Sequence, residues 1–133
     1  MRKTANENIK YMDLNLNPDF IIEHVSLYLG TCKRAVLSNS RRGAVCDSRQ
    51  ISMYFSYKFY GSSYREIGEW FNRSQWDVRH HVETCIGYMK VDDEFEKKIK
   101  MVERHLISQR IIDLAKTDIQ HELVSDTVNK ICI

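Results

Sequence analysis

Two helix-start patterns lie eleven residues apart in this chain, Ser63 followed by Glu66 and Ser74 followed by Asp77. A serine at the N-cap accepts a hydrogen bond from the third helical amide, and an acidic residue at that position complements the free amides there. Apolar residues follow each serine at the i, i+3 and i+4 spacing of one buried helical face. We therefore predict a short capped helix, a tight turn at residues 72–73 and a longer capped helix, the pattern of a helix-turn-helix. An ordinary pair of packed helices would show the same pattern.

Helical patterns continue on both sides of this unit, and no segment alternates polar and apolar residues convincingly as a strand does. Asn17-Pro18 is a helix start, Gly30 and Gly61 are helix stops, and Asp92 and Asp118 can each cap a further helix. The expected helices cover residues 18–29, 44–60, 63–71, 74–89 and 93–116, with a last one after residue 118. The predicted fold class is therefore all-α, with five to six helices.

The chain is long enough, at 133 residues, for one domain with a buried core. No apolar run approaches the roughly 20 residues that a membrane-spanning helix needs. The four cysteines, at positions 32, 46, 85 and 132, are scattered and form no CxxC pair. Cys85 falls on the apolar face of its helix, which indicates a buried apolar role. We therefore expect a reducing, cytoplasmic setting with neither disulfides nor a membrane partner.

Positive charge is concentrated in the middle of the chain. Residues 33–90 hold ten Lys and Arg against five Asp and Glu, although the whole chain has a net charge of only +2. Within this part, Arg41 and Arg42 lie in a polar segment before the helix expected at residues 44–60. A basic loop there suits contacts with DNA phosphates or with a narrow minor groove. A solvated surface loop explains the same residues, so both interpretations stay open.

The segment Ser48–Phe71, SRQISMYFSYKFYGSSYREIGEWF, resembles part of the C-terminal DNA-binding domain of the bacterial replication initiator DnaA. The match consists of an Arg-Gln pair that opens a helix with a methionine on its apolar face, and then a Ser-x-x-Glu-Ile-Gly run that ends in phenylalanine. The resemblance extends over about residues 22–90, and Arg41-Arg42 falls where the family has a basic loop whose arginine enters the minor groove. It implies a Trp-repressor-like helical bundle with a helix-turn-helix that binds double-stranded DNA.

Two features of full initiators are absent from this sequence or altered in it. No GxxxxGK[ST] loop is present to bind nucleotide phosphates, so we expect neither ATPase activity nor a bound nucleotide. The family's recognition helix opens with Arg-Asp-His-Thr-Thr, which contacts the initiator's box sequence, whereas the gapless counterpart here is Ser74–Val78, SQWDV. The scaffold is kept while the base-contacting residues differ, so we expect a target other than the standard initiator box.

The candidate DNA contacts form two groups. The residues expected at the DNA backbone or the minor groove are Arg41, Arg42, Arg49, Arg65 and Arg73. The residues expected at base edges are Gln75, Trp76, Arg79 and His80. Gln75 can pair bidentately with adenine, and Arg79 with guanine. His81 and Cys85 are one helical turn apart, but no further ligand completes a zinc site and no nucleophile lies beside a base. We therefore predict no metal, no other cofactor and no enzyme activity.

These features divide the chain into a mobile arm at residues 1–17, a DnaA-like helix-turn-helix domain at 18–90 and a helical extension at 91–133. The extension either packs on the domain or joins chains into a homo-oligomer. We predict sequence-specific binding to double-stranded DNA in transcription or replication control, at the nucleoid or, for a phage protein, in the host cytoplasm. The alternative is a DnaA-like scaffold that has lost DNA recognition and serves protein–protein assembly.

Overall fold

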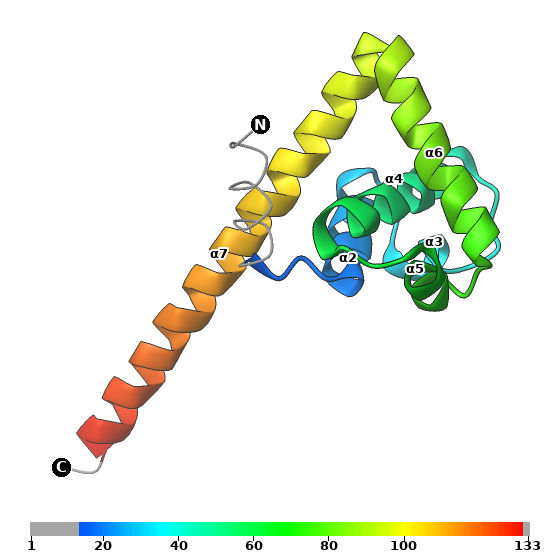
Figure 1. Ribbon diagram of the computed structural model, residues 1–133. Coiled ribbons are helices and arrows are strands. Elements are labelled where there is room, and N and C mark those ends of the chain that lie inside the picture. Colours follow the sequence, from blue (N-terminus) through cyan, green and yellow to red (C-terminus); the bar gives the residue numbers. More distant parts are fainter. Residues whose placement is uncertain (1–13, 132–133) are drawn as a thin grey trace.

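The computed structural model describes the backbone of residues 14–131 and the side chains of residues 14–117. Its helices are α2 (Pro18–Tyr28), α3 (Lys33–Val36), α4 (Gly43–Tyr60), α5 (Tyr64–Phe71), α6 (Gln75–Val91) and α7 (Asp93–Ile131). Figure 1 shows α2 to α6 gathered into one body, along which the long α7 runs. No strand occurs in the described part of the chain, and the predicted all-α fold is confirmed.

Side-chain caps start α2 and α7 where the sequence placed them. The Asn17 side-chain oxygen accepts from the Phe20 amide at 2.9 Å, and Pro18 occupies the first turn, where its missing N–H costs nothing. Asp92 Oδ1 accepts from the amides of Glu94 and Phe95 at 3.0 and 3.2 Å. Each cap satisfies amides that have no partner inside their own helix.

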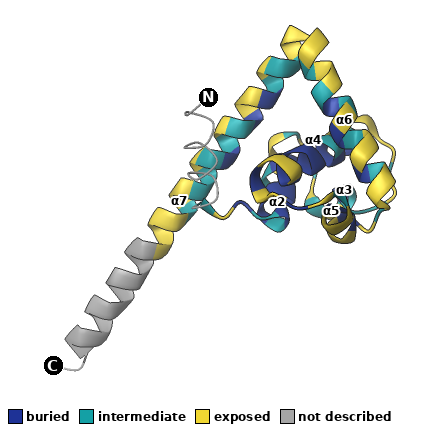
Figure 2. Ribbon diagram, viewed as in Figure 1, coloured by how far each residue is buried: buried dark blue, intermediate teal, exposed yellow. Residues whose placement is uncertain are grey.

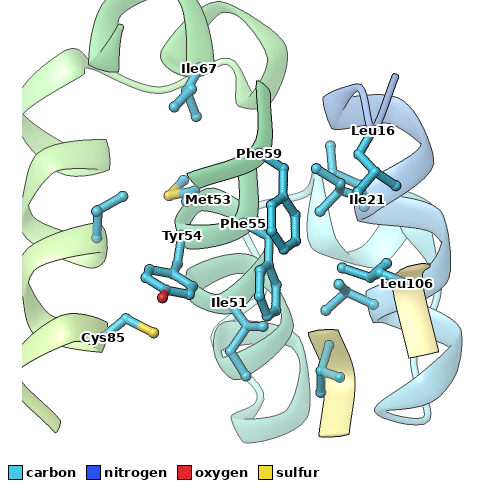
Figure 3. Close-up of a cluster of buried hydrophobic side chains, with 14 of the residues drawn as sticks. Leu16, Ile21, Ile51, Met53, Tyr54, Phe55, Phe59, Ile67, Cys85 and Leu106 are labelled. Atoms are coloured by element: carbon cyan, nitrogen blue, oxygen red, sulfur yellow. The ribbon is translucent and has the colours of Figure 1, made fainter. Parts of the chain in front are cut away.

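The core is built around α4, whose residues Ile51–Ser56 are all buried. Phe55 and Phe59 stack with ring centroids 5.3 Å apart, and Figure 3 shows them between the side chains of α2 and those of α6. Cys85 approaches from α6 and Leu106 belongs to α7, and both are fully buried. Full burial of one phenylalanine or leucine side chain contributes roughly 1.5–3 kcal/mol, so this cluster fixes how α4 and α6 sit against each other.

Helix α7 turns back at Asp92 and packs its first half on the body. Ile99, Val102 and Leu106 follow the i, i+3, i+4 spacing of one helical face and are buried. Glu103 of this half pairs with Lys58 of α4 at 3.1 Å. Figure 2 shows buried residues along this half, and residues 111–117, the last whose side chains are described, are exposed apart from the intermediate Asp113. The first half of α7 thus packs on the domain.

The end of the predicted N-terminal arm is docked on the same helix. Leu16 is buried, and the Leu14 carbonyl accepts a hydrogen bond from Arg110 Nε at 2.7 Å. The Arg110 guanidinium also lies 5.5 Å from the centre of the Phe20 ring, a cation–π arrangement. Residues 1–13 of the predicted arm lie outside the described residues.

Two predicted element boundaries are wrong. The sequence predicted no helix between residues 29 and 44, whereas this segment contains the short helix α3. The break expected at Asp118 does not occur, because α7 continues to Ile131. No glycine or proline lies near residue 118 to end the helix, and Thr117 Oγ1 bonds the Asp113 carbonyl one turn back, at 2.9 Å, as in a helix interior. In the part described here, no helix combines the length and apolar character needed to cross a membrane.

Candidate nucleic-acid interface

Helices α5 and α6 form the predicted helix-turn-helix, and both predicted caps are present. Ser63 Oγ accepts from the Glu66 amide at 3.2 Å, and Ser74 Oγ accepts from the Asp77 amide at 3.2 Å. Each cap fixes the first residue of its helix, and the turn occupies the residues between the end of α5 at Phe71 and the start of α6 at Gln75. The helix that would enter a major groove therefore begins at Gln75.

The turn between these helices depends on two backbone features. Asn72 adopts the left-handed conformation, at φ 55° and ψ 48°, which asparagine tolerates better than most residues. The Arg73 amide then donates to the Gly68 carbonyl at 2.9 Å. A β-carbon added at Gly68 would lie 2.4 Å from the carbonyl oxygen of Arg73, so only glycine allows the chain to fold back this tightly.

The outward face of α6 carries the residues predicted at base edges. Gln75, Trp76, Arg79 and His80 are all exposed, whereas Val78, Val82 and Cys85 on the opposite face are buried. Trp76 is 66% exposed, so a large aromatic surface stands in solvent at the start of the helix. An exposed side chain of this size is a ready contact for a thymine methyl or a base edge.

Acidic residues engage two of the arginines on or beside α6. Arg79 Nε bonds Glu83 Oε1 at 2.9 Å, and this hydrogen bond is the main cause that raises the pKa of Arg79. Arg73 Nη1 bonds Asp77 Oδ2 at 3.1 Å. Both pairs join residues four apart on or next to the helix. The positive charge along α6 is therefore partly neutralised within the protein itself.

Basic residues line two neighbouring hollows that meet at Arg73. One hollow, of about 620 Å³, lies at the helix-turn-helix turn and includes Arg65 and Gln75, together with the acidic Glu69. The other, of about 540 Å³, includes Arg41 and His81. Arg73 lines both, so Arg41, Arg73 and Arg65 mark a basic strip from the loop before α4 to the helix-turn-helix turn, interrupted by Glu69 and by the Arg73–Asp77 pair. Arg79 lines neither hollow and lies on the exposed side of α6.

Arg41 and Arg42 are exposed on the loop that precedes α4, where the sequence placed them. The Arg42 amide donates to Ser40 Oγ at 3.4 Å, and Arg42 is also the residue before the first turn of α4. Arg65 is likewise exposed, on the outer side of α5. These three guanidinium groups are free to approach a polyanion without any change in the backbone.

The outward position expected for Arg49 is wrong. Its side chain is 3% exposed, and its guanidinium points to the carbonyls of the preceding segment. Nε donates to Val36 O at 2.9 Å, and Nη2 donates to Ser38 O at 2.8 Å and Ser40 O at 3.1 Å. Burial, and then the nearby charge of Arg73, lower the pKa of Arg49. The sequence could not show this, because α3 and the loop fold back over the start of α4.

A polar contact between Gln50 of α4 and His81 of α6 was not predicted from the sequence. His81 Nδ1 lies 3.3 Å from Gln50 Oε1, and His81 Nε2 lies 3.6 Å from Asp77 Oδ1. Burial is the largest influence on His81 and lowers its pKa, against the opposing effect of Asp77. No group of three metal-ligating side chains occurs among the described residues. Cys85 is buried, as predicted.

A family model described as the bacterial DnaA protein helix-turn-helix matches residues 18–84. This chain belongs to that family. The resemblance carried by Ser48–Phe71 is thereby confirmed. DnaA helix-turn-helix domains are DNA-binding rather than catalytic domains, and the matched residues include all of α5 and the first ten residues of α6.

Two curated relatives are chromosomal replication initiator proteins DnaA. The protein of Thermotoga sp. strain RQ2 is 41% identical over 98 residues, which make up 74% of this chain and 21% of that protein. The protein of Pseudothermotoga lettingae is 24% identical over 106 residues, which make up 76% of this chain and 24% of that protein. The chain thus spans less than a quarter of the length of these DnaA relatives.

Proposed function

We propose that this protein binds double-stranded DNA sequence-specifically, with α6 in the major groove and the loop before α4 at the adjoining minor groove. The observation that carries the proposal is the exposed polar and aromatic face of α6 beside the basic strip through Arg41, Arg73 and Arg65. In a DNA-binding protein, a basic strip and a groove-facing helix surface have different roles. Basic side chains hold phosphates and set the register, whereas groove-facing side chains distinguish bases.

Individual roles follow from chemistry and position. Gln75, at the first position of α6, offers the amide that pairs bidentately with adenine. Trp76 presents an apolar surface to a thymine methyl, and His80 offers one donor and one acceptor when neutral. Arg41 and Arg42 suit a narrow minor groove. Arg65 and Arg73 suit phosphates that flank the entry point of α6.

We infer a target that differs from the standard initiator box. The segment Ser74–Val78 replaces the Arg-Asp-His-Thr-Thr opening of the family's recognition helix, so the hydrogen-bonding groups offered to the bases are different. Arg79, which would favour guanine, is held by Glu83. The free groups at the start of the helix therefore favour adenine and thymine. A role in transcription or replication control at the nucleoid is consistent with such a protein.

Selection of bound sequences from random duplex DNA, repeated at two salt concentrations, tests the proposal. The expected result is one recurring motif recovered at both concentrations, with an affinity that falls as salt rises. Recovery of no motif, with binding that only follows the salt concentration, would reject sequence-specific binding. Duplexes carrying the standard initiator box provide the comparison, because Ser74–Val78 at the start of α6 differs from the family's base-contacting residues.

A second candidate function is assembly, and the exposed part of α7 is the observation that favours it. Ile111, Ile112 and Leu114 are 48%, 43% and 37% exposed on a helix that continues beyond the body. Apolar side chains on one helix can pair between two copies of a chain. Sedimentation of the full chain over a range of concentrations would show dimers that dissociate on dilution. A monomer at all concentrations would leave DNA binding as the only candidate.

A further inference from the structure

The loop that carries Arg41 and Arg42 is fastened to the body by the side chain of Arg49. Three alternate carbonyls, those of Val36, Ser38 and Ser40, accept from this one guanidinium at distances of 2.9, 2.8 and 3.1 Å. Two of the carbonyls belong to the irregular segment between α3 and α4, which no regular secondary structure supports. Arg49 therefore ties this segment to α4 at three points, in addition to the hydrogen bonds that the segment makes locally.

A second arginine extends this link to the helix-turn-helix. Arg73 Nη2 donates to the same Ser38 carbonyl at 3.3 Å, while its Nη1 bonds Asp77 on the first turn of α6. The Ser38 oxygen thus accepts from one arginine of α4 and from one arginine of the turn. A continuous set of hydrogen bonds relates the loop to the start of α6, the two parts that would meet adjoining grooves.

The geometry suits arginine alone. A guanidinium presents five N–H groups in a fixed plane, so one side chain can serve three carbonyls, whereas a lysine ammonium is a compact charge without that fork. Arg49 lines the hollow that also contains Arg41, but it is only 3% exposed, and its Nε and Nη2 already donate to three carbonyls. The guanidinium of Arg49 therefore hydrogen-bonds backbone carbonyls and is not presented to a ligand.

We propose that Arg49 is a positioning residue for DNA binding: it holds the loop so that Arg41 enters the minor groove in register with α6. The proposal rests on the proposed function, because it concerns how two contacts to one duplex are coordinated. Loss of Arg49 would leave every DNA-facing side chain present but would free the loop. Arg41 would then contribute much less to affinity.

A double-mutant cycle in the full chain measures this coupling, with Arg49→Lys and Arg41→Ala alone and together, on the duplex selected by the wild-type protein. Arg41→Ala should weaken wild-type binding about tenfold, the usual scale for one groove contact. In the Arg49→Lys background the same change should have an effect of about twofold or less. Equal effects in the two backgrounds would overturn the proposal. Arg104→Lys, a charge-preserving change at an exposed arginine of α7, is the matched control and should leave the Arg41 effect intact.

Hydrogen exchange without DNA provides a readout that does not depend on the proposed function. The Ser38 amide donates to Ala35 O of α3 at 3.1 Å, and the amides of Ser40 and Arg42 donate within the loop at 3.1 and 3.4 Å. All three amides should exchange faster in Arg49→Lys than in the wild type. Amides of the buried centre of α4 should keep their protection. Unchanged loop exchange, or an equal loss of protection throughout, would show that Arg49 does not position the loop.

The double-mutant cycle and the hydrogen-exchange experiment together distinguish failure of the proposed function from failure of the positioning role of Arg49. A wild-type chain that selects no motif removes the proposed function, and hydrogen exchange still decides whether Arg49 holds the loop. A wild-type chain that selects a motif, with additive effects in the cycle, removes the positioning role alone. If Arg49→Lys does not fold, Arg73→Lys replaces it in both experiments, because it removes the second link to the Ser38 carbonyl. It also alters the Arg73–Asp77 pair and the proposed phosphate contact of Arg73, so only the change in the Arg41 effect and in loop exchange is compared. It should show the same changes with smaller size, and their absence would count against the proposal.

Discussion

Gly68 lies so close to the carbonyl oxygen of Arg73 that a β-carbon on the glycine would approach it to 2.4 Å. The neighbour is backbone, which cannot swing aside as a long side chain can. We therefore expect Gly68→Ala to force α5 and the turn apart and to lower the free energy of unfolding by about 2 kcal/mol or more, within the range of overpacking changes. Denaturant unfolding of the wild type and the variant measures the difference.

The matched control is Gly87→Ala on α6. Nothing lies within 4 Å of a β-carbon at this exposed helical position, so the substitution gains helix propensity without a clash. It should raise the free energy of unfolding by up to about 1 kcal/mol. Similar changes at the two glycines would mean that the close approach at Gly68 does not constrain the turn.

Asn72 is the second point at which the turn depends on backbone geometry. Its φ of 55° lies in the left-handed region, which costs a non-glycine L-residue roughly 1–2 kcal/mol. Asn72→Gly should therefore be neutral or stabilising, whereas Asn72→Ala should lower the free energy of unfolding by about 1 kcal/mol. Thermal and denaturant unfolding distinguish the two variants. An alanine variant as stable as the glycine variant would contradict the left-handed turn.

Local patterns in the sequence determined the helix-turn-helix, and this is why it could be predicted. Ser63 and Ser74 cap their helices through amides three residues away, so the interaction that defines each helix start lies within four consecutive residues. The apolar spacing on α6 likewise placed Cys85 correctly in the core. Interactions between residues this close in the sequence can be predicted from the sequence alone, because they do not depend on how distant segments pack.

Interactions between distant residues could not be inferred in the same way. Arg49 was expected to contact DNA from an early turn of its helix, but it is buried against carbonyls that lie 9 to 13 residues earlier in the chain. The Gln50–His81 contact spans 31 residues, and no pattern within α4 or α6 indicates it. The basic loop itself was located correctly, whereas the side chain that holds it was assigned the wrong role.

Acid should destabilise the protein through His81. Burial lowers the pKa of His81 below its ordinary value of 6.5, so the unfolded chain binds this proton more readily than the folded chain. The free energy of unfolding is then unaffected above the unfolded pKa, and it decreases as the pH falls from about 6.5 towards the lower folded pKa. Denaturant unfolding at a series of pH values between neutrality and pH 5 measures this slope.

His81→Gln removes the titrating group, so the pH slope of this variant should be smaller than that of the wild type. His105, whose pKa is also lowered by burial and by His24, contributes a slope of the same sign. The slope should therefore shrink in His81→Gln and shrink further in a double variant with His105→Gln. An unchanged slope in the single variant would show that His81 is equally accessible to protons in the folded and unfolded states.

Glu83 should limit the affinity of α6 for DNA, because its carboxylate lies on the exposed side of the helix and engages Arg79 at 2.9 Å. Glu83→Gln removes a negative charge that faces phosphate and releases the guanidinium. We expect tighter binding to random-sequence duplex and a salt dependence steeper by about one released counterion. Fluorescence anisotropy over a series of salt concentrations measures both quantities.

Glu94→Gln is the matched control for this charge change, since Glu94 is exposed on the first turn of α7 rather than on α6. It should alter the salt dependence by much less, because exposed charges beyond about one Debye length are screened. An equal gain from both substitutions would assign the effect to net charge alone. A gain that is confined to Glu83→Gln, and that disappears when Arg79→Ala is added, would show that the freed arginine makes the new phosphate contact.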